Sequence, residues 1–324
     1  MNQLRLIITA FIATILFASL GNAETPVLRA AVLKVGTVNW ELDTIKHNGL
    51  DQKNGFDLQI VGMAGNPATR IAFQGGEADV MVADWIWVAR QRADGKDFVF
   101  IPYSKAVGGL LVKKDSPVQS LSDLKGKKIG IAGGPVDKSW LLLRALAEQK
   151  GGFDLAGETE QVFGAPPLVF KSALSGEVDA AINFWHFNAK MQAAGMRQVV
   201  SVADAANELG LSSETPLLGY VVRGELVREH PELVNGLAMA SRQAKEILAT
   251  DDTAWDRLRP MMRAEKDSAF NALKDGFRAG IPTSYSVNEK DAATLLQVMA
   301  KFGGEKLVGK AVTLPQGVFL QPES

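Results

Sequence analysis

Two segments of this chain, one hundred residues apart, carry nearly the same sequence. Residues 76–95 begin with GEADVMVADW, residues 176–195 begin with GEVDAAINFW, and the two segments align without a gap. The identical positions are Gly76/Gly176, Glu77/Glu177, Asp79/Asp179, Trp85/Trp185, Ala89/Ala189, Ala93/Ala193 and Gly95/Gly195. Solenoid repeats recur every 20–50 residues or so and at least about three times. A single duplication at this distance therefore predicts two similar domains.

The first 23 residues have the pattern of a signal peptide. Arg5 precedes an apolar run over 6–20, and the small residues at 21–23 predict cleavage before Glu24. The alternative is an uncleaved membrane anchor. It is disfavoured because the apolar run is shorter than the roughly 20 residues that cross a bilayer. We therefore expect residues 1–23 to be removed and the mature protein to be exported and soluble.

The bulk composition limits the functions open to the mature chain. It is too long for one compact core and is typical of two domains. The formal net charge is −1 at pH 7, which disfavours nucleic-acid binding because that function usually needs a basic face. The chain contains no cysteine, and its three histidines are scattered outside any metal-ligand pattern. We expect neither a metal nor a cofactor.

Apolar stretches alternate with helical patterns along the first two thirds of the chain. Predicted strands cover 27–33, 56–61 and 78–83, and a second series covers 128–132, 158–163 and 178–183. Strands separated by helices in this way favour mostly parallel sheets flanked by helices. The last hundred residues are mainly helical in pattern. The sequence thus predicts an α/β fold with two similar domains.

In both copies of the duplicated segment a predicted strand ends in a polar residue just before a helix that carries a tryptophan. Asp84 precedes Trp85, and Asn183 precedes Phe184 and Trp185. Ligands of parallel α/β sheets bind beyond the carboxyl ends of the strands. If the two domains face one another, both turns point into one crevice, as in a hinged clamp.

Several segments together resemble one protein family. They are GLDQKNGFDLQIV (49–61), IAFQGGEADVMVAD (71–84), SLSDLKGKKIGIAGG (120–134) and ALSGEVDAAIN (173–183). The chain resembles the periplasmic substrate-binding proteins of ABC transporters, in the branch that handles sulfonates, taurine, nitrate and thiamine-pyrimidine precursors. The resemblance implies a two-lobed, type II-like fold. Lobe 1 would comprise 24–107 plus 222–324 and lobe 2 would comprise 108–221, with hinge crossings at YSKAVGGLLV and PLLGYVVRG.

The same resemblance implies a function and its partners. The protein would be the soluble periplasmic component of an ABC importer, a monomer that delivers a small solute to permease and ATPase subunits. A periplasmic carrier or a sensor domain stays open as an alternative on the same fold. An enzyme of the pyrimidine-precursor type is a further alternative. It is disfavoured because the sequence offers no cysteine nucleophile and no ordered acid–base pair.

Candidate ligand contacts are the residues at the strand-to-helix turns. They are Thr37, Asn39, Trp40, Asn66, Asp84 and Trp85 in lobe 1, Gly134, Lys138, Ser139, Asn183 and Trp185 in lobe 2, and Glu214 near the second crossing. Helix N-termini there offer free N–H groups, and tryptophans offer flat apolar walls. Purely structural roles are also open. Asn39, Asp84 and Asn183 are good helix caps, and the indoles could serve packing. We expect Trp87 and Trp140 to pack in the interior.

Four carboxylates lie close to the predicted crevice, namely Glu41, Asp84, Asp137 and Glu214. A carboxylate that faces the crevice would repel a bare anion. We therefore hypothesise that the ligand is zwitterionic, cationic or neutral, such as an amino-sulfonate, an amine, a heterocycle or a metal complex.

Overall fold

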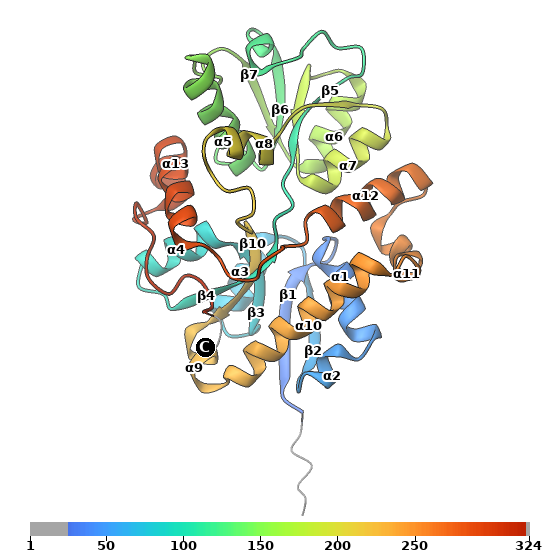
Figure 1. Ribbon diagram of the computed structural model, residues 1–324, viewed down its shortest axis with the longest axis vertical. Helices are drawn as coiled ribbons and strands as arrows, with labels where there is room; N and C mark the ends of the chain where they lie inside the picture. The colour runs from blue at the N-terminus through green and yellow to red at the C-terminus, as the bar shows by residue number, and fades with distance from the viewer. Residues whose placement is uncertain (1–24, 322–324) are drawn as a thin grey trace, which may run out of the picture.

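Two five-stranded sheets organise residues 25–321, which are the residues that the computed structural model describes. The predicted signal peptide lies outside this range. In Figure 1 one sheet lies in the lower half of the molecule and the other in the upper half. The first sheet has the order β2 (Asp57–Met63), β1 (Val27–Leu33), β3 (Val80–Asp84), β10 (Leu218–Arg223) and β4 (Phe98–Ser104). The second has the order β7 (Glu160–Gly164), β6 (Lys128–Ala132), β8 (Ala180–Ile182), β5 (Gly109–Val112) and β9 (Arg197–Ser201).

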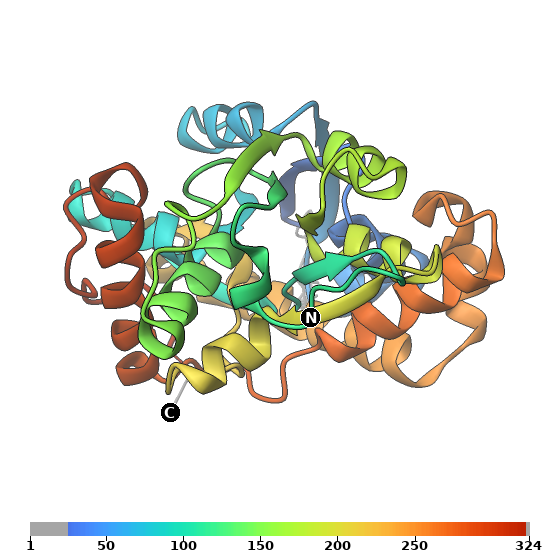
Figure 2. The same ribbon diagram turned by 90° about the horizontal axis from the view of Figure 1, so that it is seen from above.

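Helices flank both sheets (Figure 2). Lobe 1, built on the first sheet, carries α1 (Val38–His47), α2 (Leu50–Lys53), α3 (Asn66–Gln74), α4 (Trp85–Ala93), α9 (Gly224–Glu229), α10 (Pro231–Thr250), α11 (Thr253–Met262) and α12 (Asp267–Ala279). α13 (Glu289–Val308) packs on α4 of lobe 1 and on α5 of lobe 2. Lobe 2 carries η1 (Leu121–Leu124), α5 (Lys138–Leu146), η2 (Ala147–Gly151), α6 (Pro166–Ser175), α7 (Trp185–Ala193) and α8 (Val202–Glu208). Within residues 25–321, no helix combines the length and the apolar character needed to cross a membrane. The predicted two-lobed α/β fold is confirmed.

The two sheets follow one plan. β1 lies between β2 and β3, to which it is parallel, and β6 lies likewise between β7 and β8. The next strand, β10 in lobe 1 and β5 in lobe 2, is antiparallel to its neighbours. β3 and β8 come from the duplicated segments and occupy the same place in their sheets. The duplication in the sequence therefore corresponds to a duplication in the fold.

The lobe boundaries follow from the strand pairing. The first crossing lies between β4 and β5 and contains the predicted boundary at residues 107 and 108. The second crossing lies earlier than predicted. β10 pairs with β3 and β4, so residues 218–221 belong to lobe 1 and the chain leaves lobe 2 before Leu218. The family resemblance implies a hinge crossing at PLLGYVVRG, and the apolar sequence of this segment does not reveal which sheet it completes.

A repeated aspartate explains part of the sequence duplication. Asp79 accepts a hydrogen bond from the backbone amide of Arg29 at 2.9 Å, and its own amide donates to the carbonyl of Arg29. Asp179 accepts from the amide of Lys128 at 2.8 Å, and its amide donates to the carbonyl of Lys128. Each aspartate thus fastens the start of the third strand to the central strand. The position that Asp79 and Asp179 share in the two copies therefore sets the strand register within each lobe.

The repeated glycines have a structural role as well. Gly76 and Gly176 follow α3 and α6 with φ angles of 81° and 82°, and Gly95 and Gly195 follow α4 and α7 with φ angles of 83° and 92°. Only glycine adopts this left-handed region at little cost, so these residues end the helices. The glycines that are identical in the two copies thus end the corresponding helices of the two lobes.

A buried ion pair joins three elements of lobe 1. Lys245 of α10 places its Nζ 2.6 Å from Oε2 of Glu41 in α1, and both side chains are almost completely buried. Oε1 of Glu41 accepts hydrogen bonds from the hydroxyls of Tyr220 and Ser241, each at 2.7 Å. Burial lowers the pKa of Lys245, and the attraction of Glu41 opposes that shift. Since each charge is desolvated, each depends on its partner.

We predict that Lys245→Met strongly destabilises the protein. It leaves the Glu41 carboxylate buried without its counter-charge, and breaking such a pair costs about 3–5 kcal/mol. Glu41→Gln in the same chain should restore much of the loss, because a neutral amide needs no cation. Unfolding in urea measures both effects. Lys128→Met is the matched control. Its exposed pair with Glu160 should contribute less than about 1 kcal/mol, so equal losses in the two lysine variants would contradict the prediction.

Candidate functional site

The turn after β3 places a carboxylate between the two lobes. Oδ1 of Asp84 accepts a hydrogen bond from the backbone amide of Trp87 at 2.9 Å, so Asp84 is the N-cap of α4 as predicted. Oδ2 of Asp84 accepts from Nζ of Lys138 at 2.9 Å. Lys138 is the first residue of α5 in lobe 2, so this ion pair connects the lobes at two helix N-termini. Burial raises the pKa of Asp84, but Lys138 and the Trp87 amide outweigh that effect and lower it.

The corresponding turn in lobe 2 carries a phenylalanine. The alignment of the duplicated segments pairs Asp84 with Phe184, and Phe184 is the N-cap residue of α7. Its side chain is 40% exposed. A Cβ atom on Gly133 would lie 3.5 Å from the Phe184 ring and 3.2 Å from Oδ2 of Asp137, so the ring lies beside the loop that leads to Lys138. We did not single out Phe184 from the sequence, although the alignment contained the signal.

Asn183 lies just before α7, and both a ligand contact and a helix cap were open for it. The cap is wrong, because Phe184 is the N-cap residue of α7. Asn183 is 2% exposed, its Nδ2 donates to the carbonyl of Pro166 at 2.9 Å, and its Oδ1 accepts from the amide of Phe184 at 2.8 Å. The side chain is therefore occupied in joining the α7 turn to the start of α6. These bonds hold the residues at the start of α7 in position.

Two of the three tryptophans predicted at the site are buried in lobe 1. Trp85 is 0% exposed and its ring lies 5.7 Å from that of Phe319. Trp40 is 4% exposed and packs edge-on against Trp255 at 6.0 Å. The structure thus shows the packing alternative for Trp40 and Trp85. Trp185 is partly exposed, and its ring lies 5.9 Å from that of Trp40 across the lobe boundary.

Trp87 and Trp140 pack in the interior as predicted, and Trp87 lies beside a cation that was not predicted. Trp140 is 2% exposed, and Trp87 stacks on Phe98 with ring centroids 5.8 Å apart, so both pack in the interior. The guanidinium of Arg70 lies 5.2 Å over the Trp87 ring. Its charge also lowers the pKa of Asp84. Arg70 was not predicted, because it lies in the second turn of α3 and away from any strand end.

The other predicted residues of lobe 1 lie at the starts of α1 and α3. Thr37 is the N-cap residue of α1 and is half-buried, whereas Asn66 is the first residue of α3 and is exposed. The prediction that Asn39 caps α1 is wrong. Its Nδ2 instead donates to the carbonyls of Leu33 and Gly36, at 2.8 and 3.0 Å. Asn39 therefore holds the β1–α1 turn in place.

Gly134 and Ser139 flank Lys138 in lobe 2. Gly134 has a φ angle of +96°, which a residue with a side chain would adopt only under strain. Ser139 is the second residue of α5 and is half-buried. The end of β3 thus meets the start of α5 at the Asp84–Lys138 ion pair, and α1 meets the start of α7 at the contact of Trp40 with Trp185. We call the region between the lobes at these strand ends the interlobe site.

Glu214 lies at the hinge, apart from the interlobe site. Its carboxylate accepts hydrogen bonds from Nζ of Lys105 at 2.7 and 2.9 Å and from the Thr283 hydroxyl at 2.9 Å. Lys105 belongs to the first crossing, Glu214 to the second, and Thr283 to the link between α12 and α13. The Glu214 carboxylate therefore connects three segments of the chain at the hinge, and this contact is structural.

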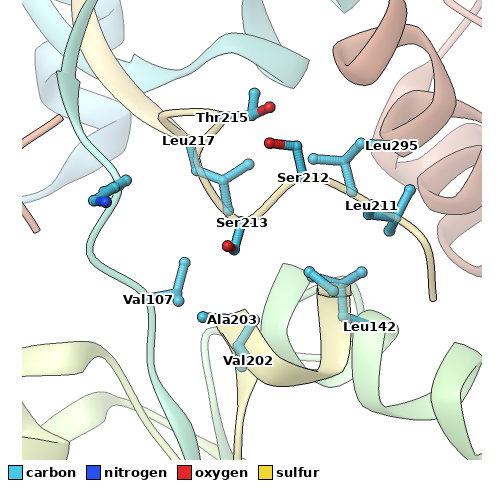
Figure 3. Close-up of a pocket in the computed structure, with 12 residues that line it drawn as sticks. Val107, Leu142, Val202, Ala203, Leu211, Ser212, Ser213, Thr215, Leu217 and Leu295 are labelled. Carbon is cyan, nitrogen blue, oxygen red and sulfur yellow. The ribbon is translucent and has the colours of Figure 1, made fainter. Parts of the chain in front are cut away.

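A small pocket lies beside this hinge (Figure 3). The crossings contribute Val107 and Leu217, while Leu142 of α5 and Leu295 of α13 line its other walls. Its volume is about 20 Å³. That space holds about one water molecule, so the pocket cannot accept an organic solute.

The four carboxylates predicted near the crevice differ from the expectation in their charge environment. Glu41, Asp84 and Glu214 are each paired with a lysine, so these carboxylates do not present free negative charge. Asp137 is the N-cap of α5, and burial raises its pKa to about 6. Burial also lowers the pKa of His186 to about 4, which keeps its imidazole neutral at pH 7.

Two lobes joined by two crossings, with facing turns at the carboxyl ends of their strands, define the fold of the periplasmic binding proteins. The chain belongs to the NMT1/THI5-like family, whose model matches residues 45–254. Among characterised relatives, the riboflavin-binding protein RibY of Chloroflexus aurantiacus is 30% identical over 172 residues. The match covers 53% of this chain and 46% of RibY, so the chain matches less than half of that relative's length.

Solved structures share the fold at low sequence identity. The aliphatic sulphonate-binding protein SsuA of Escherichia coli superposes with a TM-score of 0.71 and 19% identity, covering 92% of this chain and 94% of SsuA. The alkanesulfonate-binding protein SsuA of Xanthomonas axonopodis pv. citri, bound to MOPS, gives a TM-score of 0.68 and 18% identity over 92% and 99% of the two chains. These matches establish that this chain has the fold of periplasmic solute-binding proteins.

We predict that Asp137→Asn removes one source of pH-dependent stability. The folded-state pKa of Asp137 is about 6, above the value of 3.8 for an unperturbed aspartate, so the folded protein keeps this proton longer than the unfolded chain does. Stability from this group is present at low pH and is lost as the pH rises from about 4 to 6. Asparagine keeps the cap and never ionises.

Urea unfolding at several pH values measures this effect. The free energy of unfolding of the parent, relative to Asp137→Asn, should fall between about pH 4 and 6 and stay level above about pH 7, with a slope of at most about 1.4 kcal/mol per pH unit. Parallel profiles for the two proteins would show that Asp137 has an ordinary pKa.

Proposed function

We propose that this protein is the solute-binding component of an ABC importer. It is exported to the periplasm, acts as a monomer, holds a small organic solute between its lobes and delivers it to permease and ATPase subunits. It makes and breaks no bond in the solute. The ion pair between Asp84 and Lys138 carries this proposal, because both lobes supply polar groups to one place. The exposed ring of Phe184 lies beside the loop that leads to Lys138. The named functions of RibY and the two SsuA proteins support it.

The solute contacts that we propose share one feature, since all lie near the carboxyl ends of strands, at β1, β2 and β3 in lobe 1 and at β6 and β8 in lobe 2. They are Thr37, Asn66, Asp84, Gly134, Lys138, Ser139 and Phe184. Asn39 and Asn183 hold the turns in place, and Trp40 and Trp85 support them from the core of lobe 1. Separation of the lobes would expose Asp84 and Lys138 to the solute, and reclosure would surround it.

The ion pair restricts the chemistry of the solute. A bare anion could bind Lys138, but it would leave Asp84 without its cation in a place where the carboxylate is only 12% exposed. An unpaired charge there is costly. A solute with both a donor and an acceptor can satisfy both residues at once, and the Phe184 ring offers a face for a flat or cationic group. We therefore propose that the solute is zwitterionic or carries a heterocyclic ring.

A screen of purified protein tests this proposal. Native mass spectrometry would detect a co-purified solute, and thermal shift would compare riboflavin, MOPS and taurine with methanesulfonate and nitrate. A solute at about 100 times its Kd stabilises the folded state by about 2.7 kcal/mol, which is readily measured. We expect ring-bearing or zwitterionic compounds to bind. Binding of inorganic anions alone, strengthened by Asp84→Asn, would refute the proposed solute class.

We predict that three substitutions weaken binding of the solute that the screen identifies. Asp84→Asn and Lys138→Met each remove a charged hydrogen-bond partner, worth about 1.5–3 kcal/mol, so Kd should rise by roughly 10- to 100-fold. Phe184→Ala should raise Kd by up to about tenfold, and Phe184→Tyr should restore it. Isothermal titration measures these constants. Lys114→Met, an exposed change in lobe 2, is the control, and a Kd unchanged in all three variants would place the solute elsewhere.

A further inference from the structure

Trp185 reaches across the lobe boundary into a matching space in lobe 1. Its ring lies edge-on to Trp40, with centroids 5.9 Å apart and an interplanar angle of 87°. Trp40 in turn packs against Trp255 and Phe277. Trp185 thus adds to an aromatic cluster that belongs to the core of lobe 1, although its own helix, α7, packs on α6 and β5 of lobe 2.

A glycine in α12 makes room for this indole. A Cβ atom on Gly276 would lie 2.9 Å from Cζ3 of Trp185 and 3.0 Å from its Cε3, closer than non-bonded carbon atoms tolerate. Glycine within a helix costs about 0.5–1 kcal/mol relative to alanine, so its presence here needs a reason. The fit of the Trp185 ring supplies one, because only a residue without a side chain leaves space for it.

The rest of one face of α7 also contacts lobe 1. Ala189, one helical turn after Trp185, is 6% exposed and lies in the core cluster of lobe 1. Nζ of Lys190 lies 3.4 Å from the carbonyl oxygen of Met262, near the end of α11. In Figure 1, α12 runs beneath α7 at the junction of the two lobes. α7 is therefore a helix of lobe 2 with one face seated on lobe 1.

We infer that Trp185 and Gly276 form a latch that holds the two lobes together. Trp185 is a positioning residue, because it directly follows Phe184 and so fixes where the start of α7 lies relative to Asp84 and Lys138. When the ring is seated, the interlobe site is assembled. When it is withdrawn, the lobes separate. The inference rests on the proposed function, which requires that the lobes move, but it concerns residues outside the proposed solute contacts.

The lack of native cysteine allows a direct test on the full mature chain. Gln74 on α3 and Lys171 on α6 are exposed and lie in different lobes. Each would be replaced by cysteine and spin-labelled, and pulsed electron paramagnetic resonance would measure the distance between the two labels. In this background we would compare Gly276→Ala, Trp185→Ala and the double variant. Asn271→Ala, an exposed change on α12, is the control for helix propensity.

We predict that Gly276→Ala raises the ratio of separated to closed molecules by at least about fivefold. The added methyl group overpacks the contact with Trp185 in the closed state, and about fivefold corresponds to the smallest usual cost of overpacking. Its melting temperature should stay equal or rise, because alanine favours the helix. Trp185→Ala should also favour separation, and adding Gly276→Ala to it should change nothing more. Asn271→Ala should leave the distances unchanged.

Two results would overturn the latch. One is an unchanged distance distribution in Gly276→Ala, and the other is the same shift with and without the Trp185 ring. Neither measurement uses a solute, so failure of the latch is distinct from failure of the proposed function. If the latch holds but no solute binds in the screen, only the transport proposal is lost.

Discussion

The position of β10 is the constraint on which the rest of the structure depends. This strand lies between β3 and β4 in the sheet of lobe 1, yet the chain reaches it only after building all of lobe 2. β5, the corresponding strand of lobe 2, is instead the first strand built there. The chain must therefore cross between the lobes twice, and the Glu214 carboxylate ties both crossings to the link before α13. Two crossings allow the lobes to rotate about a hinge, which is the motion that the proposed function requires.

Within this frame the same local plan carries different chemistry in each lobe. Asp79 and Asp179 set the register of the third strands, and glycines with left-handed backbone end the helices on either side. At the helix start the copies carry residues of different chemistry, Asp84 in lobe 1 and Phe184 in lobe 2. One lobe thus presents a carboxylate that caps a helix, and the other presents an exposed ring beside the loop that leads to Lys138. A duplicated framework with unlike ends can enclose a solute that is polar on one side and flat on the other.

Two of the contacts between the lobes differ in physical kind. The pair formed by Asp84 and Lys138 is polar and lies where a solute would compete for it. The contact of Trp185 with Trp40 and α12 is apolar and lies beside that place. A polar pair can be exchanged for solute contacts at little net cost, whereas burial of an indole favours closure whatever the solute is. Under the proposed function, the polar pair would serve recognition of the solute and the aromatic contact would serve closure.

The sequence by itself determined the two-lobed α/β class, the equivalence of the duplicated segments and the cap at Asp84, because strand periodicity, glycine positions and cap residues are local signals. Tertiary structure alone decided the rest. LLGYVVR could complete either sheet, and only pairing placed it in lobe 1. Trp40 and Trp85 were equally compatible with a wall or a core position, and packing buried them. The partners of Glu41 and Glu214 come from distant parts of the chain, so charges that looked free in the sequence are paired in space. Which groups meet across a fold depends on long-range geometry that no local pattern records.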